Sequence, residues 1–510
     1  MSNRLSRRGF LAAGSAYGSC MLLPRSLAAN SAGANGDSDL THLSARTALT
    51  ALRRGDITAE RYAQALLDRC RSGARLNAFI TLRPEQVLQA ARERDRERRA
   101  GKALGPLHGL PIPVKDSVNT ADLPTTAGTP ALRHFQPRED APLVRALRTA
   151  GAVVLGKTNL HELSYGYTSN NHAFGAILNP YDPTRIPGGS SGGSGASIAY
   201  RMAPLGIAED TEGSIRVPAA MCGIAGFRPT TGRYPSAATV PTSAVCDQLG
   251  PHARSVADLL LFDEVLTGRH AEGPAPPLQG VRLGVVRGYF YTGLDPEVER
   301  VTDAALERLR RAGAVLVEGE LPQLAHYIDI CTNQILNHDV RPSLSRYLAD
   351  YHTGISFETL LAQASPDVRR MIEPAITRGS PDFVTDEQYR HIMTVDRPAL
   401  QRMYRDYFQR SGVTAIVFPT TIVAAPPLGE EDRELQVRGR RIALDDAIAR
   451  NIAPGSTTGL PGLVLPAGLT ASGLPVGLEF DGPAGSDASL LQLGLALENA
   501  LGTLPPPRDL

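Results

Sequence analysis

The sequence predicts an α/β fold, in which a central β-sheet is covered by helices on both faces. Three observations predict it: short apolar runs typical of buried strands, amphipathic segments typical of helices, and the alternation of the two along the chain. Hydrophobic residues make up 42% of the 510 positions, and no long low-complexity linker divides them. We therefore expect one large unit, with a loop at 273–277.

Each element follows from its local pattern. Apolar spacing predicts three helices near the N-terminus, at 43–54, 59–71 and 84–100. Short apolar runs predict buried strands at 110–114, 152–155, 204–207, 281–286, 315–317, 414–418 and 463–465. Helices are predicted between or after these strands, at 140–150, 296–312, 326–349 and 485–501. The stretch 324–412 is predicted to be nearly all helix and to form a cap over one end of the sheet.

The N-terminus has the pattern of an export signal. The run Ser6-Arg7-Arg8-Gly9-Phe10-Leu11 is a twin-arginine motif, an apolar stretch follows at 11–23, and small residues at 27–29 offer a cleavage site. We expect residues 1–29 to be removed after transient contact with the twin-arginine export machinery. The mature chain, 30–510, would then be periplasmic or secreted. The apolar stretch is too short for a stable membrane insertion.

Charge and cysteine usage exclude several classes of function. The formal net charge is +1, and the arginines at 92–99 alternate with acids, which is typical of a solvated helix face and not of a nucleic-acid site. Beyond the signal the cysteines are widely spaced and form no CxxC pair, so we expect buried free thiols and no metal or disulfide framework; they are Cys70, Cys222, Cys246 and Cys331. The sequence leaves the oligomeric state open.

Lysine usage points to proton chemistry. Of the 53 basic residues only Lys102, Lys115 and Lys157 are lysines. Arginine keeps its proton in proteins, whereas a buried lysine can become a neutral base. Lys115, in Pro-Val-Lys-Asp at 113–116, is therefore a candidate base.

Two familiar motifs fit only superficially. Residues 151–158 match the pattern of a phosphate-binding P-loop, but Ala-Val-Val-Leu between the glycines favours a straight buried strand. Gly-Gly-Ser-Ser-Gly at 188–192 matches the nucleophile elbow of α/β-hydrolases, but loop residues precede it and the last histidine is His391. An α/β-hydrolase-like esterase that uses Ser190 remains an alternative.

Two serines lie in backbone that favours special geometry. Glycines around Ser190 permit an unusual turn that points its hydroxyl inward. A strand at 204–207 and a helix start at 214–220 would place Ser214 at a helix N-terminus, where unsatisfied N–H groups can stabilise an oxyanion. The alternative is a flexible Gly-Ser linker with Ser214 as an ordinary N-cap.

Four ordered segments show a family resemblance. The chain resembles the amidase signature family at 110–116, 156–159, 186–194 and 210–219, with 24 residues between Ser190 and Ser214. Weaker similarity at 247–251, 459–461 and 477–480 extends it over essentially all of the mature chain, which is identified as an amidase signature domain. The resemblance implies the amidase signature fold, with a mixed, mostly parallel sheet.

The resemblance also implies an amide-bond hydrolase with a Ser-cisSer-Lys triad. Ser214 would attack the amide carbonyl and form an acyl-enzyme. Ser190, after a cis peptide bond from Gly189, would carry the proton to a neutral Lys115. No cofactor or metal is implied.

Residues around the nucleophile take supporting roles by the same resemblance. Backbone N–H groups of Thr211, Glu212, Gly213 and Ser214 would form the oxyanion hole. Asp210 and Arg216 would support the loop from behind. Glu212 departs from the commonest family pattern, which has glycine there, and a carboxylate at this place would disfavour a substrate carboxylate.

The segment 214–235 looks most like the mandelamide and indoleacetamide hydrolase branch, which releases ammonia from arylacetamides. We therefore expect a small-molecule amide as substrate, with Ser164 and Thr168 lining the acyl pocket. Peptide amidase, anilide hydrolase and carbamate hydrolase activities are alternatives within the family. A non-catalytic exported binding protein is an alternative outside it.

Overall fold

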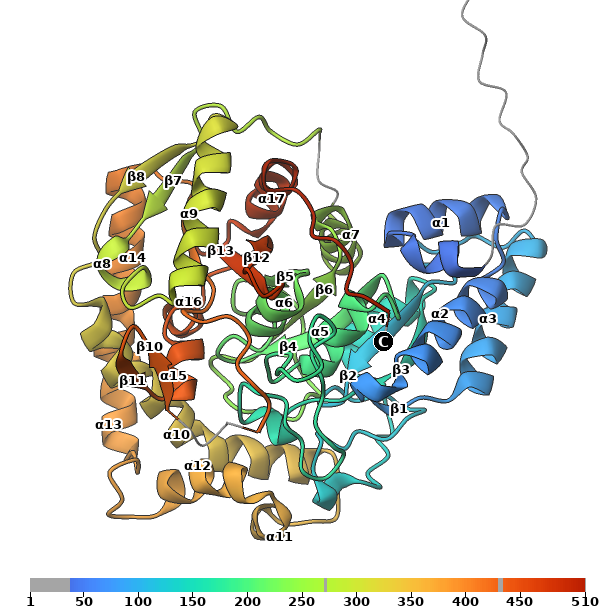
Figure 1. Cartoon of the computed structure of the whole chain (residues 1–510). Helices are drawn as coiled ribbons and strands as arrows, with labels where there is room; N and C mark the ends of the chain where they lie inside the picture. The colour runs from blue at the N-terminus through green and yellow to red at the C-terminus, as the bar shows by residue number, and fades with distance from the viewer. Residues whose placement is uncertain (1–36, 270–272, 430–433, 510) are drawn as a thin grey trace, which may run out of the picture. The chain divides into compact units, whose positions relative to one another are not determined.

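The computed structural model of the chain describes residues 37–269, 273–429 and 434–509, and these are built around one large β-sheet. The predicted export signal lies outside the described residues. The sheet has eleven strands in the order β1-β3-β2-β4-β6-β5-β12-β13-β9-β7-β8 (Figure 1). In chain order they are β1 Phe79–Thr81, β2 Pro111–Lys115, β3 Val153–Thr158, β4 Leu205–Asp210, β5 Ala225–Arg228, β6 Gln248–Ala253, β7 Arg282–Val285, β8 Val315–Glu318, β9 Ala415–Pro419, β12 Gly462–Leu469 and β13 Pro475–Asp481. A small separate hairpin pairs β10 Leu435–Val437 with β11 Arg440–Ile442.

The sheet is mixed, as predicted. Strands β3, β2 and β4 pair in parallel and form one block, and β9, β7 and β8 form a second. Antiparallel pairs through β6, β5, β12 and β13 join the two blocks. The mostly parallel pairing that the family resemblance implies is found within the two blocks, where helices connect successive strands.

Helices surround this sheet. They are α1 Ala45–Arg54, α2 Ala59–Ser72, α3 Pro84–Arg99, α4 Pro142–Thr149, α5 Gly192–Ala199, α6 Arg216–Cys222, α7 Val256–Thr267, α8 Arg287–Phe290, α9 Pro296–Arg311, α10 Leu324–Asp350, α11 Phe357–Gln363, α12 Pro366–Ile376, α13 Asp386–His391, α14 Arg397–Ser411, α15 Leu444–Ala449, α16 Ala453–Thr458 and α17 Asp487–Leu501. Side-chain caps fix several starts: Ser44 accepts from the Thr47 amide before α1, and Thr58 accepts from the Arg61 amide before α2.

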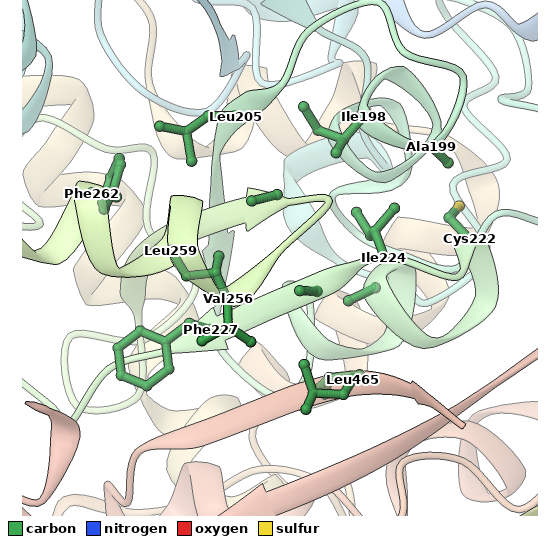
Figure 2. Packing of buried hydrophobic residues seen from close by; sticks show 14 of the residues in the cluster. Ile198, Ala199, Leu205, Cys222, Ile224, Phe227, Val256, Leu259, Phe262 and Leu465 are labelled. Carbon is green, nitrogen blue, oxygen red and sulfur yellow. The ribbon is translucent and has the colours of Figure 1, made fainter. Parts of the chain in front are cut away.

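Both faces of the sheet are covered, as β5 illustrates. A Cβ placed on Gly226 would meet the Ala219 side chain of α6, so this residue faces α6. Its neighbour Phe227 pairs with Leu463, whose side chain contacts α17 at Gly494. Because successive strand residues point to opposite faces, α6 and α17 lie on opposite faces. Figure 2 shows Phe227 together with Val256 and Leu259 of α7, which packs beside α17.

The predicted elements are confirmed with shifts of a few residues, and the predicted strands correspond to β2, β3, β4, β7, β8, β9 and β12. The sequence analysis missed β1, β5, β6 and β13. The P-loop-like stretch 151–158 contains β3, so the strand interpretation of it is confirmed.

The stretch 324–412 is nearly all helical, as predicted, and it packs in two ways. Helices α10 to α12 share a hydrophobic cluster with loop residues such as Leu132, Leu163 and Val240. Helix α14 instead packs through Tyr404 and Phe408 on residues of β9. The first part therefore lies over loops that leave the sheet, and α14 lies against the sheet itself.

Two further expectations concern the described residues alone. Their four cysteines are all buried and unpaired, so the free-thiol prediction is confirmed; they are Cys70, Cys222, Cys246 and Cys331. Among the helices that the structure describes, none combines the length and apolar character that a membrane span requires.

Candidate active site

Lys115 ends β2 and lies wholly inside the protein. Strand β2 runs parallel to β4, with Val114 opposite Ile207. The Lys115 Nζ donates to Ser190 Oγ at 2.7 Å and to Glu209 Oε2 at 2.6 Å. None of the Lys115 side chain is exposed. Burial lowers the pKa of this amine, and the nearby Glu209 carboxylate opposes that shift. Lys115 thus sits in the environment that a lysine base requires.

Ser190 lies in a tight turn before α5. The peptide bond between Gly189 and Ser190 is cis, so this expectation is confirmed. A Cβ on Gly189 would lie 2.7 Å from the Tyr167 carbonyl carbon, which explains why glycine precedes the serine. Ser190 is fully buried and its hydroxyl faces the Lys115 amine. The Gly-Ser run is therefore an ordered turn and not a flexible linker.

Ser214 lies on the loop that follows β4. Gly213 before it has φ +100°, and a Cβ there would fall 1.8 Å from Ile452 Cδ1, so a side chain is excluded. Among the described residues, none makes a hydrogen bond with the Ser214 hydroxyl. Helix α6, which follows this loop, packs on the Ser190 turn, since a Cβ on Gly188 would meet Val217 Cγ1 at 2.9 Å.

The expected position of Ser214 within the helix needs correction. Helix α6 begins at Arg216 with Ile215 as its N-cap, so Ser214 precedes the helix and caps nothing. The cause is Asp210, whose carboxylate accepts from the amides of Gly213 and Ile215 at 2.7 and 3.0 Å. The same carboxylate accepts from the Arg216 amide at 3.4 Å, so Asp210 caps the start of α6 in place of Ser214.

Asp210 and Arg216 are brought together behind this loop. Arg216 Nε donates to Asp210 Oδ2 at 3.0 Å, and Arg228 donates to Asp210 Oδ1 at 2.9 Å. Arg216 also donates to Glu479 Oε1 at 2.8 Å. All four side chains are buried. The two arginines hold the pKa of Asp210 well below its usual range, so the carboxylate stays ionised and accepts the loop amides.

Of the four backbone amides expected to bind the oxyanion, one is already engaged within the loop. The Gly213 N–H donates to Asp210 at 2.7 Å, so it is engaged within the loop and does not point to a substrate. In the described part of the chain, the amides of Thr211, Glu212 and Ser214 have no hydrogen-bond partner. These three N–H groups are the donors that the loop leaves available.

Glu212 turns its carboxylate toward a tyrosine. Its Oε2 accepts from the Tyr167 hydroxyl at 2.9 Å, and only 9% of the residue is exposed. Burial raises the pKa of Glu212 to about 7, although the Tyr167 hydrogen bond and Arg216 act in the opposite direction. The carboxylate expected beside the nucleophile is therefore present and changes charge near neutral pH.

The two predicted pocket residues are buried among polar partners. Ser164 Oγ donates to Glu209 Oε2 at 3.0 Å, which connects it to Lys115. Thr168 Oγ1 lies 3.3 Å from His161 Nδ1. Their part in an acyl pocket stays a prediction.

The sequence analysis missed Glu209. This residue immediately precedes Asp210 on β4, and its carboxylate also accepts from Thr211 Oγ1 at 2.9 Å. The available signal was a pair of adjacent acidic residues, Glu209 and Asp210, at the end of a strand that is otherwise apolar. Within the described residues, no cluster of three or more His, Cys, Asp or Glu side chains is arranged to hold a metal ion.

The chain is similar to known proteins in sequence and in structure. The family model described as Amidase matches residues 61–491. An indoleacetamide hydrolase from Agrobacterium vitis is 38% identical over 454 residues, covering 89% of this chain and 96% of that protein. A mandelamide hydrolase from Pseudomonas putida is 36% identical over 481 residues, covering 92% and 93%. The solved structure of native peptide amidase from Stenotrophomonas maltophilia matches with a TM-score of 0.75 at 29% identity, covering 92% of this chain and 99% of that one.

Proposed function

The chain belongs to the amidase family, and from that premise we propose that it hydrolyses carboxamides of the arylacetamide type with Lys115, Ser190 and Ser214. The observation that carries the proposal is the 2.7 Å hydrogen bond from Lys115 to Ser190 inside a fully buried site, beside the loop of Ser214.

The residues divide the chemistry as follows. Ser214 Oγ attacks the amide carbonyl while its proton passes through Ser190 to the neutral Lys115 amine. The amides of Thr211, Glu212 and Ser214 stabilise the oxyanion. The tetrahedral intermediate collapses, the C–N bond breaks, and the proton returns through Ser190 to the leaving amine. Water then attacks the acyl-enzyme on Ser214 by the same route and releases the acid.

Exposure, and not contact with Lys115, favours Ser214 over Ser190 as nucleophile. A base accepts a proton from the hydroxyl it contacts, so Ser190 could in principle attack directly, as the esterase alternative requires. Ser190 is, however, fully buried, with its main-chain oxygen bonded by the His161 amide at 3.0 Å. Ser214 has 4% of its surface exposed and a hydroxyl without any hydrogen bond to the described residues. This arrangement supports Ser190 as a proton carrier.

The substrate class rests on the relatives and on Glu212. Indoleacetamide and mandelamide hydrolases are similar over nearly the whole chain, which favours an arylacetamide that releases ammonia. Glu212 next to the nucleophile disfavours a substrate with a free carboxylate, because two like charges in a buried site repel. A neutral aromatic amide fits both points.

A panel of amides tests the proposal. Purified mature protein, without added metal, is assayed for ammonia or amine release from phenylacetamide, mandelamide, indoleacetamide, an amidated dipeptide, an anilide and an aryl carbamate. We expect turnover of the arylacetamides and its loss in Ser214→Ala. Activity confined to the dipeptide, anilide or carbamate would assign the chain to another branch of the family, and unchanged turnover in Ser214→Ala would contradict the assigned nucleophile.

Labelling separates the two serines. A fluorophosphonate reacts with an activated serine, and peptide mapping locates the adduct. We expect it on Ser214. An adduct on Ser190 instead would support the esterase alternative.

We also propose that the protein is exported to the periplasm, or secreted, by the twin-arginine route. The support is the Arg7-Arg8 pair with the apolar and small residues that follow it. In a bacterial host, we expect the wild-type chain in the periplasmic fraction and Arg7→Lys/Arg8→Lys in the cytoplasm. Equal distribution of the two would contradict export by this route.

A further inference from the structure

The Lys115 amine has a second partner besides Ser190, and that partner is charged. Glu209 Oε2 lies 2.6 Å from Nζ, and the Glu209 main-chain oxygen lies at 3.4 Å. Only 2% of the Glu209 side chain is exposed. A carboxylate so close to Lys115 favours the protonated form of the lysine, which cannot act as the proposed base.

The Glu209 carboxylate is held on both oxygens. Ser164 donates to Oε2 at 3.0 Å and Thr211 donates to Oε1 at 2.9 Å. Thr211 Oγ1 also lies 2.7 Å from Asp247 Oδ1. The Asp247 carboxylate accepts from the Ser243 amide at Oδ1 and from the Thr242 amide at Oδ2. The Glu209 carboxylate is therefore fixed with Oε2 toward the amine and cannot turn away without losing these bonds.

The amine in turn is fixed between two acceptors. An N–H points to Glu209, and the side of Nζ that faces Ser190 carries an N–H in the ammonium and the lone pair in the neutral amine. The carboxylate therefore sets the direction in which Lys115 faces the serine. The same relation exists in the Ser-His-Asp triad, where a buried carboxylate orients the base and stabilises its charged form. Here the base is a lysine and the carboxylate comes from the adjacent parallel strand.

We propose that Glu209 is a positioning residue for the amidase reaction: it aims the Lys115 amine at Ser190 and stabilises the ammonium that forms when Lys115 takes the proton. The inference rests on the proposed function. Before the step, Lys115 is neutral beside an ionised Glu209. In the step, the Ser190 proton moves to Nζ and the Ser214 proton replaces it on Ser190 Oγ, so that Lys115 and Glu209 form an ion pair. When the C–N bond breaks, Ser190 gives its proton to the leaving amine and takes one back from the ammonium.

Other charged groups also face this pair. Asp210 and Asp247 favour the ammonium, and His252 on β6 disfavours it when charged. None of the three contacts Nζ in the described structure, whereas Glu209 does. Burial and the Glu209 carboxylate raise the pKa of Asp247 to about 8. A substitution at Glu209 therefore removes the nearest charge and also lowers the pKa of Asp247, while Asp210 stays ionised.

The test is the pH dependence of Glu209→Gln. Glutamine keeps the shape; its carbonyl accepts from Lys115 and Ser164, and its amide donates to Thr211. Loss of the negative charge destabilises the ammonium, so the acid limb of the kcat/KM profile should move down by about one to two pH units. The weaker base should lower the pH-independent maximum about ten- to a hundredfold. The proposal requires both the shift of the acid limb and the fall of the maximum. Both should result from a change in kcat more than from a change in KM.

Two variants control for structure. Glu209→Asp keeps the negative charge on a shorter side chain, so the carboxylate lies farther from the Lys115 amine. We expect the acid limb of this variant near that of wild type, and its maximal kcat/KM between those of wild type and Glu209→Gln. Asp116→Asn makes the same charge change in another buried lysine pair, Lys157–Asp116, and should not move the limb. Circular dichroism and thermal unfolding of each variant show that the compared proteins are folded.

The outcomes separate this inference from the proposed function. The rate of Ser214 labelling by a fluorophosphonate gives a second pH profile that needs no particular amide. If wild type is labelled on Ser214 but cleaves no amide of the panel, the substrate class fails and the labelling profile still tests Glu209. If the acid limb of Glu209→Gln stays at its wild-type pH, the role of Glu209 is overturned. The same holds if the acid limb moves but the pH-independent maximum of the profile does not fall. Absence of labelling on Ser214 overturns both proposals.

Discussion

Lys115 and Lys157 are two of the three lysines in the chain, and each is fully buried against a carboxylate. They lie on neighbouring parallel strands, β2 and β3. Lys157 Nζ lies 3.1 Å from Asp116 Oδ1 and donates to Thr125 Oγ1 at 2.8 Å and the Pro124 oxygen at 3.0 Å. Lys115 differs in the hydroxyl that it contacts, which is that of Ser190.

This difference separates a structural ion pair from a reactive one. Burial lowers the pKa of both lysines, and a carboxylate opposes the shift in both. A perturbed pKa alone therefore does not identify the base. Lys157 pairs with Asp116 and donates to two loop acceptors, and one of them, the Thr125 hydroxyl, donates in turn to the Val118 oxygen at 3.3 Å. Lys115 faces the Ser190 hydroxyl, which has no other hydrogen-bond partner among the described residues. The partner of the lysine, and not its burial, predicts its role.

The largest expected effect comes from Lys115→Met. Methionine fills the space but cannot accept a proton, so we expect arylacetamide turnover to fall by at least about a thousandfold. The measurement is the specific activity of protein shown to be folded by circular dichroism. Retention of more than a tenth of the wild-type rate would remove Lys115 as the base.

Lys157→Met is the matched substitution in the other pair. It leaves the buried Asp116 without its cation, so we expect the free energy of unfolding to fall by about 3–5 kcal/mol. Turnover per folded molecule should stay within about twofold of wild type. Urea unfolding and active-site titration measure the two quantities. A thousandfold loss of turnover here would mean that the two pairs do not differ in role.

Glu212 sharpens the comparison, because it is buried without a lysine partner and is bonded by Tyr167. Its pKa is raised to about 7, so its contribution to stability is complete below the unfolded pKa, near about 4.3. The contribution is lost as pH rises through about 7. Against Glu212→Gln, wild type should therefore lose about 3 kcal/mol of unfolding free energy between about pH 4.5 and 8.

Unfolding curves of the two proteins at a series of pH values provide this measurement. The control is Tyr167→Phe, which removes the hydrogen bond to Glu212 and should shift the transition to higher pH. Two stability curves that run parallel from about pH 4.5 to 8 would contradict the raised pKa of Glu212.

The smallest effect is expected when both partners of the structural pair are changed. In Lys157→Met/Asp116→Asn the charge left behind by Lys157→Met is removed, so about 1–3 kcal/mol of the lost stability should return. The equivalent double variant, Lys115→Met/Glu209→Gln, should regain stability similarly but no turnover. Recovery of turnover in Lys115→Met/Glu209→Gln would contradict the distinction between the two pairs. So would a failure of both double variants to regain stability.

The sequence predicted the fold where local patterns are strong. The strand at β3 was predicted from its apolar run, and the helices at α1 and α2 from their apolar spacing. Strand β6 was missed because Gly250 and Pro251 are typical of turns. In the fold, Pro251 lies opposite Ile207 in the middle of the sheet. Packing between β4 and β5, which no local pattern encodes, overrides the turn preference of these residues.

By itself the sequence determined the residue types of the candidate site: a rare lysine, a serine among glycines, and Ser214 after a glycine that needs positive φ. These depend on short segments, whose backbone preferences are local. Only the tertiary structure decided that Glu209 is the partner of Lys115 and that Glu479 is a partner of Arg216. Glu209 lies 94 residues from Lys115 along the chain, and only the pairing of β2 with β4 brings the two charges together. Electrostatic pairing depends on distance in space, which strand order sets and sequence neighbours do not.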